Sequence, residues 1–260
     1  MKMKRYCRGI AAGLLGCGLI ATSAVAAEEA PYAELAASAY SQYIWRGFAF
    51  SQDSIVVQPS LTVGYHGFSV NLWGNLDTDP VGGDKASWNE TDLTLAYDWT
   101  TGPVDFSAGY IYYGLEGADD TQELYLSAAY DVLLNPTITI YRDFAAAPGW
   151  YVTLGVSHSI PLRDEIALEL GAQAGYLYIS SASTLAEVGT DDAYRALHDG
   201  LISAAVPIPV GQYFTVTPEL AYSFALSSKA RDLLKEANSD AIGKDKDNFI
   251  YGGVTLSMAF

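Results

Sequence analysis

The chain has 260 residues, of which 50% are hydrophobic and 17% are charged, and its formal net charge is −16. A surface this acidic repels the phosphates of DNA and RNA, which argues against nucleic acid as a partner. Beyond the first residues, no segment approaches the roughly 18 uninterrupted apolar residues of a membrane-spanning helix. We therefore expect no helical anchor in the mature chain.

The first residues have the three parts of a secretory signal peptide. Four basic residues precede an apolar stretch at 10–20, and small residues follow at 24–26, which is the pattern of a cleaved leader. We expect residues 1–27 to be removed and residues 28–260 to form the mature domain. Both cysteines leave with the leader. The 14 basic residues fall to 10 against 30 acidic ones, so the net charge becomes −20.

From residue 30 onward, stretches of about 9 to 15 residues alternate in polarity, as transmembrane β-strands do. In the last stretch, Ile250 and Val254 fall on one face, whereas Tyr251 and Thr255 fall on the other. A soluble sandwich would carry many Lys and Arg on its second face, but here that face is mostly Gly, Ser, Thr, Asn and Gln. We predict an all-β fold, a closed antiparallel up-and-down transmembrane β-barrel of about 12 strands, with 10 strands as the alternative. The predicted strands are 32–46, 55–65, 68–77, 91–99, 103–113, 121–131, 137–144, 150–160, 165–179, 200–206, 212–226 and 249–260.

The connections between these strands alternate in length. The turn at 66–67 is tight, whereas the segments at 78–90, 180–199 and 227–248 are long. Barrels of the Gram-negative outer membrane have short periplasmic turns and longer outer loops. We therefore expect both termini on the periplasmic side of the outer membrane.

Aromatic residues are frequent near the ends of the predicted strands, and the chain contains 19 Tyr and 5 Trp. Amphipathic rings favour the bilayer interface, so we interpret them as aromatic belts rather than ordinary cross-strand packing. The expected partners are outer-membrane lipids and lipopolysaccharide. The terminal aromatic residue, Phe260, is a candidate signal for the barrel-assembly machinery, and its removal is expected to impair assembly.

Several short motifs together resemble one family. They are 43–48 (Tyr-Ile-Trp-Arg-Gly-Phe), 58–60 (Gln-Pro-Ser), 67–68 (Gly-Phe), 72–75 (Leu-Trp-Gly-Asn), 149–151 (Gly-Trp-Tyr) and 198–200 (His-Asp-Gly). In these motifs and in its Phe-terminated last strand, the chain resembles the TorF family of porins over most of its mature length. The resemblance implies an outer-membrane barrel with a transport function, and it implies no particular substrate or site.

The sequence contains no strong catalytic or metal-binding motif, and we expect no catalytic residue, no metal and no cofactor. A calcium loop at 77–84 is contradicted by Val81, which stands where an oxygen ligand is required. His198 is predicted on the outer side near Ser181 and Ser183, but no Gly-x-Ser-x-Gly element accompanies it. We expect a protein that is not an enzyme. The alternatives are an outer-membrane lipid hydrolase and a structural barrel that docks periplasmic cell-wall enzymes.

Arg46 is the basic residue that we single out. Alternation along the first predicted strand puts it on the lumen face near the outer mouth, opposite several acids. It either sets a constriction by pairing with them or forms a structural salt bridge that closes the barrel's interior. The candidate lumen and constriction residues are Arg46, Asp77, Asp92, Glu123, Glu169 and Glu219.

The predicted lumen face is dominated by Gly, Ser and Thr, which cannot fill a barrel of this width, so it points to water rather than to a packed core. Because acids outnumber bases on that face, we expect passive passage of small cationic or neutral hydrophilic solutes. The loop at 227–248 contains good helix formers from Lys229 to Ala237, with Asn238 near a stop. We expect a surface helix on anionic lipid headgroups, with a lid over the mouth as the alternative.

Overall fold

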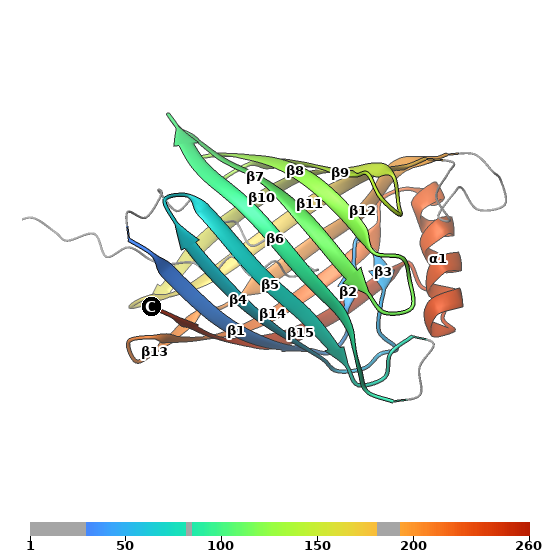
Figure 1. The fold of residues 1–260 in the computed structure, drawn as a ribbon, viewed down its shortest axis with the longest axis horizontal. Helices are drawn as coiled ribbons and strands as arrows, with labels where there is room; N and C mark the ends of the chain where they lie inside the picture. Colours follow the sequence, from blue (N-terminus) through green and yellow to red (C-terminus); the bar gives the residue numbers. More distant parts are fainter. Residues whose placement is uncertain (1–29, 82–84, 181–192) are drawn as a thin grey trace, which may run out of the picture.

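Twelve antiparallel strands close into a barrel (Figure 1). The structure is a computed structural model that describes residues 30–81, 85–180 and 193–260. The predicted signal peptide, residues 1–27, lies outside these ranges. The crossing strands are β1 (Tyr32–Tyr40), β4 (Val56–Tyr65), β5 (Phe68–Asp77), β6 (Ser87–Thr101), β7 (Val104–Leu115), β8 (Thr121–Tyr130), β9 (Thr137–Asp143), β10 (Gly149–Arg163), β11 (Ile166–Ile179), β12 (Tyr194–Ala205), β14 (Phe214–Ala225) and β15 (Asn248–Ala259).

Each crossing strand pairs with its neighbours along the chain, and the sheet closes where β1 meets β15, with Glu34 opposite Ala259 and Tyr40 opposite Gly253. The short strand β13 (Ile208–Val210) extends one turn by pairing with β14. Closure leaves no strand edge unpaired, which is the condition for crossing a bilayer with strands. The predicted up-and-down barrel of 12 strands is confirmed.

The alternation of side chains between the two faces is also confirmed. On β15, Ile250 is 71% exposed on the outer face, whereas Tyr251 is 2% exposed on the inner face. Large apolar residues stand exposed around the barrel because a lipid bilayer, rather than water, is their natural surrounding. They include Leu35, Leu61, Val63, Leu72, Leu95, Leu124, Leu126, Ile138, Leu154, Ile202, Leu220, Val254 and Leu256.

The loop lengths divide the barrel into two ends. Tight turns gather at the end that carries the C-terminus, which we call the terminus end, and longer loops gather at the opposite α1 end (Figure 1). The turn at His66-Gly67 has φ angles of 50° and 82°. Two central residues with positive φ define the type I′ turn that best fits a two-residue hairpin. The predicted tight turn at 66–67 is therefore confirmed.

Two predicted strand boundaries are wrong. The first strand was expected to run to residue 46, but β1 ends at Tyr40 and the chain turns into the barrel. The strand expected at 200–206 begins at Tyr194, because β12 follows β11 as far as the pair Ile179 and Tyr194, past an irregularity between Ala174 and Tyr176. Local alternation does not show where a chain leaves the wall.

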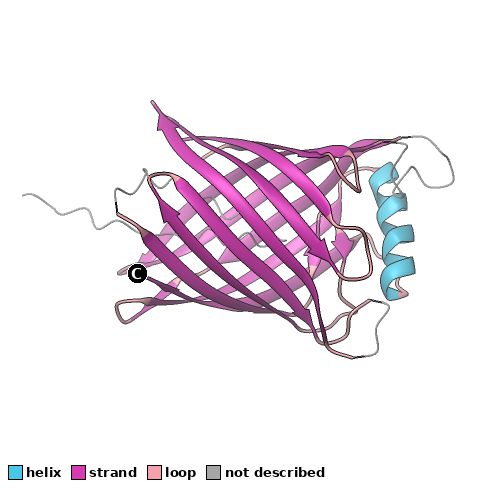
Figure 2. Cartoon of the chain, in the orientation of Figure 1, coloured by secondary structure: helices cyan, strands magenta, loops and turns pink. Residues whose placement is uncertain are grey.

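The single helix of the described residues, α1 (Ser228–Ile242), lies across the α1 end (Figure 2). Ser227 caps its start, and Gly243, with φ 66°, ends it in the left-handed conformation. Its Ala230, Leu233, Leu234 and Asn238 are buried against the barrel. The expectation of a surface helix on lipid headgroups is therefore wrong, and the alternative of a lid is right.

Asn238 does not stop the helix, which continues to Ile242. A polar residue in the last turn resembles a stop signal in the sequence, but this side chain has buried partners instead. In the described parts of the chain, no helix is long and apolar enough to cross a membrane.

Candidate functional site

A small hairpin fills the lumen at the α1 end. It consists of β2 (Ile44–Trp45) and β3 (Phe48–Ala49), with Arg46 and Gly47 as its two-residue tip. The tip has φ angles of 50° and 83°, so it is a type I′ turn in which a non-glycine residue adopts a left-handed conformation. Figure 1 shows β2 and β3 at the α1 end of the barrel, next to α1. Arg46 therefore reaches the lumen from a hairpin, and its predicted position on the first strand is wrong.

The guanidinium of Arg46 is held by one carboxylate and three aromatic rings. Its two terminal nitrogens donate to the two Glu123 oxygens at 2.8 Å each, and Glu123 also accepts a hydrogen bond of 2.9 Å from the Tyr113 hydroxyl. The Arg46 Cζ atom lies 4.2 Å from the ring centroid of Tyr151, 5.0 Å from that of Tyr141 and 4.1 Å from that of Trp45.

Arg46 therefore pairs with Glu123, one of the acids that we expected to face it in the lumen. The Glu123 side chain is 2% exposed and that of Arg46 is 10% exposed. A bidentate pair has the geometry of the strongest charge-assisted hydrogen bonds, and the ring faces add cation–π attraction. We call Glu123, Tyr113, Tyr141 and Tyr151 the wall cage, because all four belong to strands β7 to β10 of the barrel wall.

The backbone of the hairpin tip is anchored by His198 on β12. Its Nε2 lies 3.0 Å from the Arg46 carbonyl oxygen, and its Nδ1 lies 2.7 Å from the Tyr194 hydroxyl. A carbonyl oxygen can only accept, so Nε2 carries the proton and Nδ1 accepts from Tyr194. His198 therefore acts as a structural link between the wall and the hairpin.

Helix α1 also anchors this hairpin, through the side chain of Asn238. The Asn238 side chain accepts a hydrogen bond of 2.8 Å from the Ala49 amide and donates to the carbonyls of Gly47, at 3.3 Å, and Lys246, at 2.8 Å. Residues 41–55 and α1 thus form one unit, which we call the plug.

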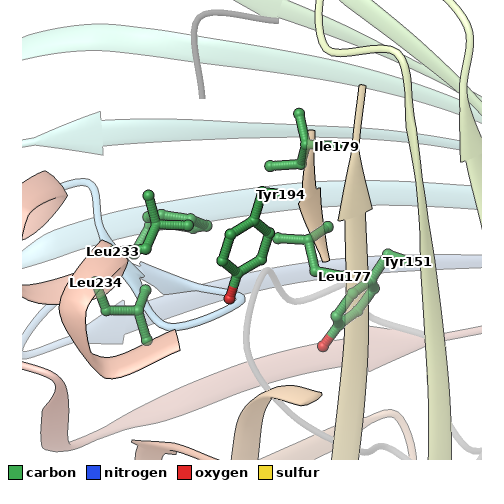
Figure 3. Close-up of a cluster of buried hydrophobic side chains, with 7 residues drawn as sticks. Tyr151, Leu177, Ile179, Tyr194, Leu233 and Leu234 are labelled. Carbon is green, nitrogen blue, oxygen red and sulfur yellow. The ribbon is translucent and has the colours of Figure 1, made fainter. Parts of the chain in front are cut away.

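An apolar cluster joins the plug to the wall (Figure 3). In the close-up, Leu233 and Leu234 lie on one side of Tyr194, and Leu177 and Tyr151 lie on the other. Phe48 of the hairpin belongs to the same cluster. Close packing explains the glycine at the hairpin tip, because a Cβ atom at Gly47 would lie 2.9 Å from a methyl group of Leu234.

A cavity of about 150 Å³ lies between the hairpin and the wall, beside Arg46 and the wall cage. Two of the polar groups that line it, the Trp73 Nε1 donor and the Asp92 Oδ1 acceptor, are buried without a hydrogen-bond partner among the described residues. Unpaired buried polar atoms are rare in folded proteins. The cavity is therefore suited to hold water or a small polar solute.

Asp92 lines the cavity beside Arg46, but the other three predicted constriction acids do not converge on it. Asp77 accepts from the Ser54 hydroxyl at 2.6 Å and from a backbone amide, and so holds the base of the plug. Glu219 accepts from Tyr40 at 3.0 Å. Glu169 accepts from the Ser159 hydroxyl at 2.7 Å, close to a turn of the terminus end. These three acids are spread along the lumen rather than gathered in one ring.

Small lumen residues often lie beneath a tyrosine ring. A Cβ atom at Gly109 would lie 2.4 Å from the ring of Tyr125, and one at Gly253 would lie 2.5 Å from the ring of Tyr40. Each ring belongs to the residue that pairs with the glycine across the sheet. The expectation that small residues leave open water at these positions is wrong, because aromatic rings from the neighbouring strand occupy the space.

The described residues give little support to a hydrolytic site. His198 is buried and faces inward rather than toward lipid, and both of its ring nitrogens have partners. Ser181 and Ser183 lie outside the described residues. Asp199 accepts from the Tyr151 hydroxyl at 2.9 and 3.0 Å.

No group of three His, Cys, Asp or Glu side chains suited to a metal ion occurs in the part of the chain that the structure describes. The loop acid Asp120 accepts hydrogen bonds from the Tyr112 hydroxyl and the Leu115 amide, and these lower the pKa of its carboxyl. Its role in the structure is to close the loop between β7 and β8.

Three outer-membrane proteins are among the solved structures that are similar to this chain. A bacterial polysaccharide outer membrane secretin matches over 89% of this chain and 98% of its own, with 8% identity and a TM-score of 0.41. OmpT, an outer membrane protein of Vibrio cholerae, matches over 92% and 100%, with 10% identity and a TM-score of 0.40. The β domain of a Bordetella autotransporter matches over 88% and 98%, with 10% identity and a TM-score of 0.38. No protein-family model and no curated protein matches the sequence.

The class of the protein follows from its own architecture. A closed barrel satisfies its backbone hydrogen bonds within the sheet, and apolar side chains cover its outer face while its inner face is polar. That combination defines an outer-membrane β-barrel protein.

Proposed function

We propose that the protein is a gated outer-membrane channel for the passive passage of small cationic or neutral hydrophilic solutes, and that the present structure is its closed state. The observation that carries the proposal is the plug, which fills one end of a polar lumen and is held there by noncovalent contacts alone. The resemblance to the TorF porins points to the same kind of transport.

The central contact of the plug supports a gate more than a permanent stopper. A buried ion pair costs much of its attraction in desolvation, and well-packed apolar residues would often stabilise the same site as well or better. The pair of Arg46 and Glu123 therefore adds specificity of position rather than much stability. Such a pair can be separated when the carboxylate and the guanidinium gain other partners.

The charges of the lumen support the preference for cations. Arg46 is neutralised by Glu123, and the further lumen acids include Glu169 and Glu219. Fixed negative charge in a narrow passage raises the local concentration of cations. We further propose that the α1 end faces outward and that the termini are periplasmic. The channel needs no catalytic residue, metal or cofactor.

Planar bilayers test the proposal directly. The refolded protein is expected to give small, intermittent, cation-selective conductance, measured as a shifted reversal potential in a KCl gradient. Glu169→Gln and Glu219→Gln are expected to lower the selectivity, because each removes a lumen charge that lies away from the Arg46 pair. Glu116→Gln is the matched control, since Glu116 lies in an exposed loop outside the lumen. Silence after verified insertion, even with the plug removed, or a clear preference for anions would refute the channel.

A further inference from the structure

The wall cage has the chemistry of a receptor for a guanidinium ion. Glu123 presents both oxygens to the fork of Arg46 at 2.8 Å, and the rings of Tyr141 and Tyr151 lie within 5.0 Å of its central carbon. A carboxylate with aromatic faces around it binds planar cations through bidentate hydrogen bonds and cation–π attraction. In this structure the guanidinium in the cage is the side chain of Arg46, which belongs to the plug.

The cage is built without help from its occupant. Glu123 is held by the Tyr113 hydroxyl at 2.9 Å, and the Tyr151 hydroxyl is held by Asp199. Tyr141 packs between two other rings, with centroid distances of 5.8 Å to Tyr125 and 6.0 Å to Tyr151. All of these residues belong to wall strands, so the cage keeps its partners when the hairpin leaves.

Arg46 is a tethered occupant of this cage. It lies at a hairpin tip with φ 50°, the left-handed conformation that the first central residue of a type I′ turn requires. In the plug, its carbonyl is fixed by His198 and its neighbour Gly47 by Asn238. The arrangement is that of an intramolecular ligand that must leave before a free solute can enter.

We propose that the wall cage is a binding site for small guanidinium solutes, and that Arg46 occupies it as a built-in competitor. This inference rests on the proposed function and names the solute class that the channel admits. The adjoining cavity of about 150 Å³ has room for the rest of a small ligand. It also contains the unpartnered Asp92 oxygen, which suits an alkylguanidinium that carries a second hydrogen-bond donor.

The tether of Arg46 to the plug sets the concentration range in which a free solute can compete with it for the cage. A group on a short tether has an effective concentration on the order of millimolar. The wild-type protein therefore responds weakly to millimolar guanidinium, whereas a variant without the Arg46 side chain responds strongly. This difference between the two proteins distinguishes an occupied site from a surface that attracts cations in general.

The binding test uses the full-length barrel in detergent micelles and methylguanidinium as the probe. In Arg46→Ala, about 1 to 10 mM methylguanidinium, the range set by the tether, is expected to raise the unfolding temperature. Urea, which is planar but neutral, is expected to have no such effect. The wild type and the double variant Arg46→Ala/Glu123→Gln are expected to respond weakly or not at all.

Arg142→Ala is the matched control. The Arg142 guanidinium lies 5.1 Å from the ring of Trp150 and donates to the Gly149 carbonyl rather than to a carboxylate. Its removal is expected to create no site for methylguanidinium. If Arg46→Ala does not refold, the same probe is added during refolding, where the cage predicts a recovered yield with methylguanidinium and none with urea.

Conductance separates this inference from the proposed function. If Arg46→Ala binds methylguanidinium but never conducts, the channel fails and the binding site remains. If it conducts, and methylguanidinium neither blocks the current nor stabilises the barrel more than urea or potassium does, the binding site fails and the channel remains. An equal response in the wild type and in Arg46→Ala would also overturn the proposal.

Discussion

The two halves of the lumen differ in the side chains that they contain. Toward the α1 end, the plug packs apolar and aromatic side chains around one ion pair. Toward the terminus end, the wall contains short polar residues that bond to each other across strands. Asn71 donates to Thr62 at 2.8 Å, and the hydroxyls of Ser127 and Thr139 lie 2.8 Å apart.

This difference separates the wall from the part that can move. Hydroxyl pairs on neighbouring strands belong to the sheet and change only if the barrel opens. The plug contains a hairpin and a helix that have no ladder pairing with the wall strands. The backbone hydrogen bonds of the plug to the rest of the barrel are few and lie near its ends, as between Ser41 and Gly252 and between Gln52 and Asp79. Segments with so few backbone bonds to the wall open locally at lower cost than a closed sheet. The following predictions test that division in order of decreasing effect.

Removal of α1 is expected to have the largest effect. With residues 228–242 replaced by a short Gly-Ser linker, the hairpin loses the Asn238 bonds and the cover of Leu233 and Leu234. We expect long-lived openings in bilayers in place of brief ones. The barrel should still migrate faster unboiled than boiled on a denaturing gel, because every ladder pair remains. As a control, a matched replacement of the exposed loop at 117–119 should leave conductance unchanged. If the barrel fails to assemble without α1, the plug is part of the fold rather than a separable gate.

Leu234→Ala is expected to loosen the plug without removing it. Leu234 is fully buried and contacts the hairpin tip. Truncating a buried leucine costs about 2–5 kcal/mol, and here the loss falls on the plug rather than on the sheet. Hydrogen exchange at residues 43–50 should quicken while exchange in β6 and β7 stays slow. Leu133→Ala, at a side chain 76% exposed, is the control, and equal acceleration in the plug and in the wall would show that the two are one cooperative unit.

The sequence predicted the wall well because alternation with period two is a local property. Every crossing strand was found, with errors at the two places where the chain turns away from the wall or follows a bulge. Past Tyr40 the sequence continues through Gln42, Tyr43 and Ile44 with no glycine or proline before Gly47, so no turn residue marks where the chain enters the lumen. The direction of the chain past Tyr40 depends on contacts inside the barrel, which the local sequence does not show.

The candidate site was predicted in part, and for a reason that was partly wrong. Arg46 and Glu123 were both named, but Arg46 arrives on a hairpin instead of on a strand. The roles of His198 and Asn238 were missed, since each joins segments about 150 to 190 residues apart. The pairing of Tyr125 with Gly109 needed the register of the sheet, which composition does not supply. The helix at 228–242 was predicted with a lid only as the alternative, because the sequence does not show that its buried face packs against the barrel.

Asn238→Ala is expected to weaken the plug less than Leu234→Ala does. It leaves the Ala49 amide and the Gly47 carbonyl without their side-chain partner. An unsatisfied buried backbone group costs about 1–3 kcal/mol. The frequency of channel openings should rise, and the midpoint of barrel unfolding should stay near that of the wild type. Asn248→Ala, at an exposed asparagine that bonds to Asp247, should change neither quantity, and a silent Asn238→Ala would show that the hairpin does not depend on the helix.

Ser227→Ala is expected to have the smallest effect of the series. The Ser227 hydroxyl accepts a hydrogen bond of 3.1 Å from the Ala230 amide at the start of α1 and donates one of 2.8 Å to the Leu197 carbonyl on β12. Loss of an N-cap costs a helix about 1 kcal/mol, which changes the equilibrium between bound and released helix without removing any apolar contact. We expect a modest increase in opening frequency with unchanged selectivity, because no lumen charge is altered. Ser227→Thr keeps the capping oxygen and should restore wild-type behaviour, whereas Ser228→Ala, one residue into the helix, should have no effect. If Ser227→Ala and Ser227→Thr behave alike, docking of the helix depends on its leucines and not on its cap.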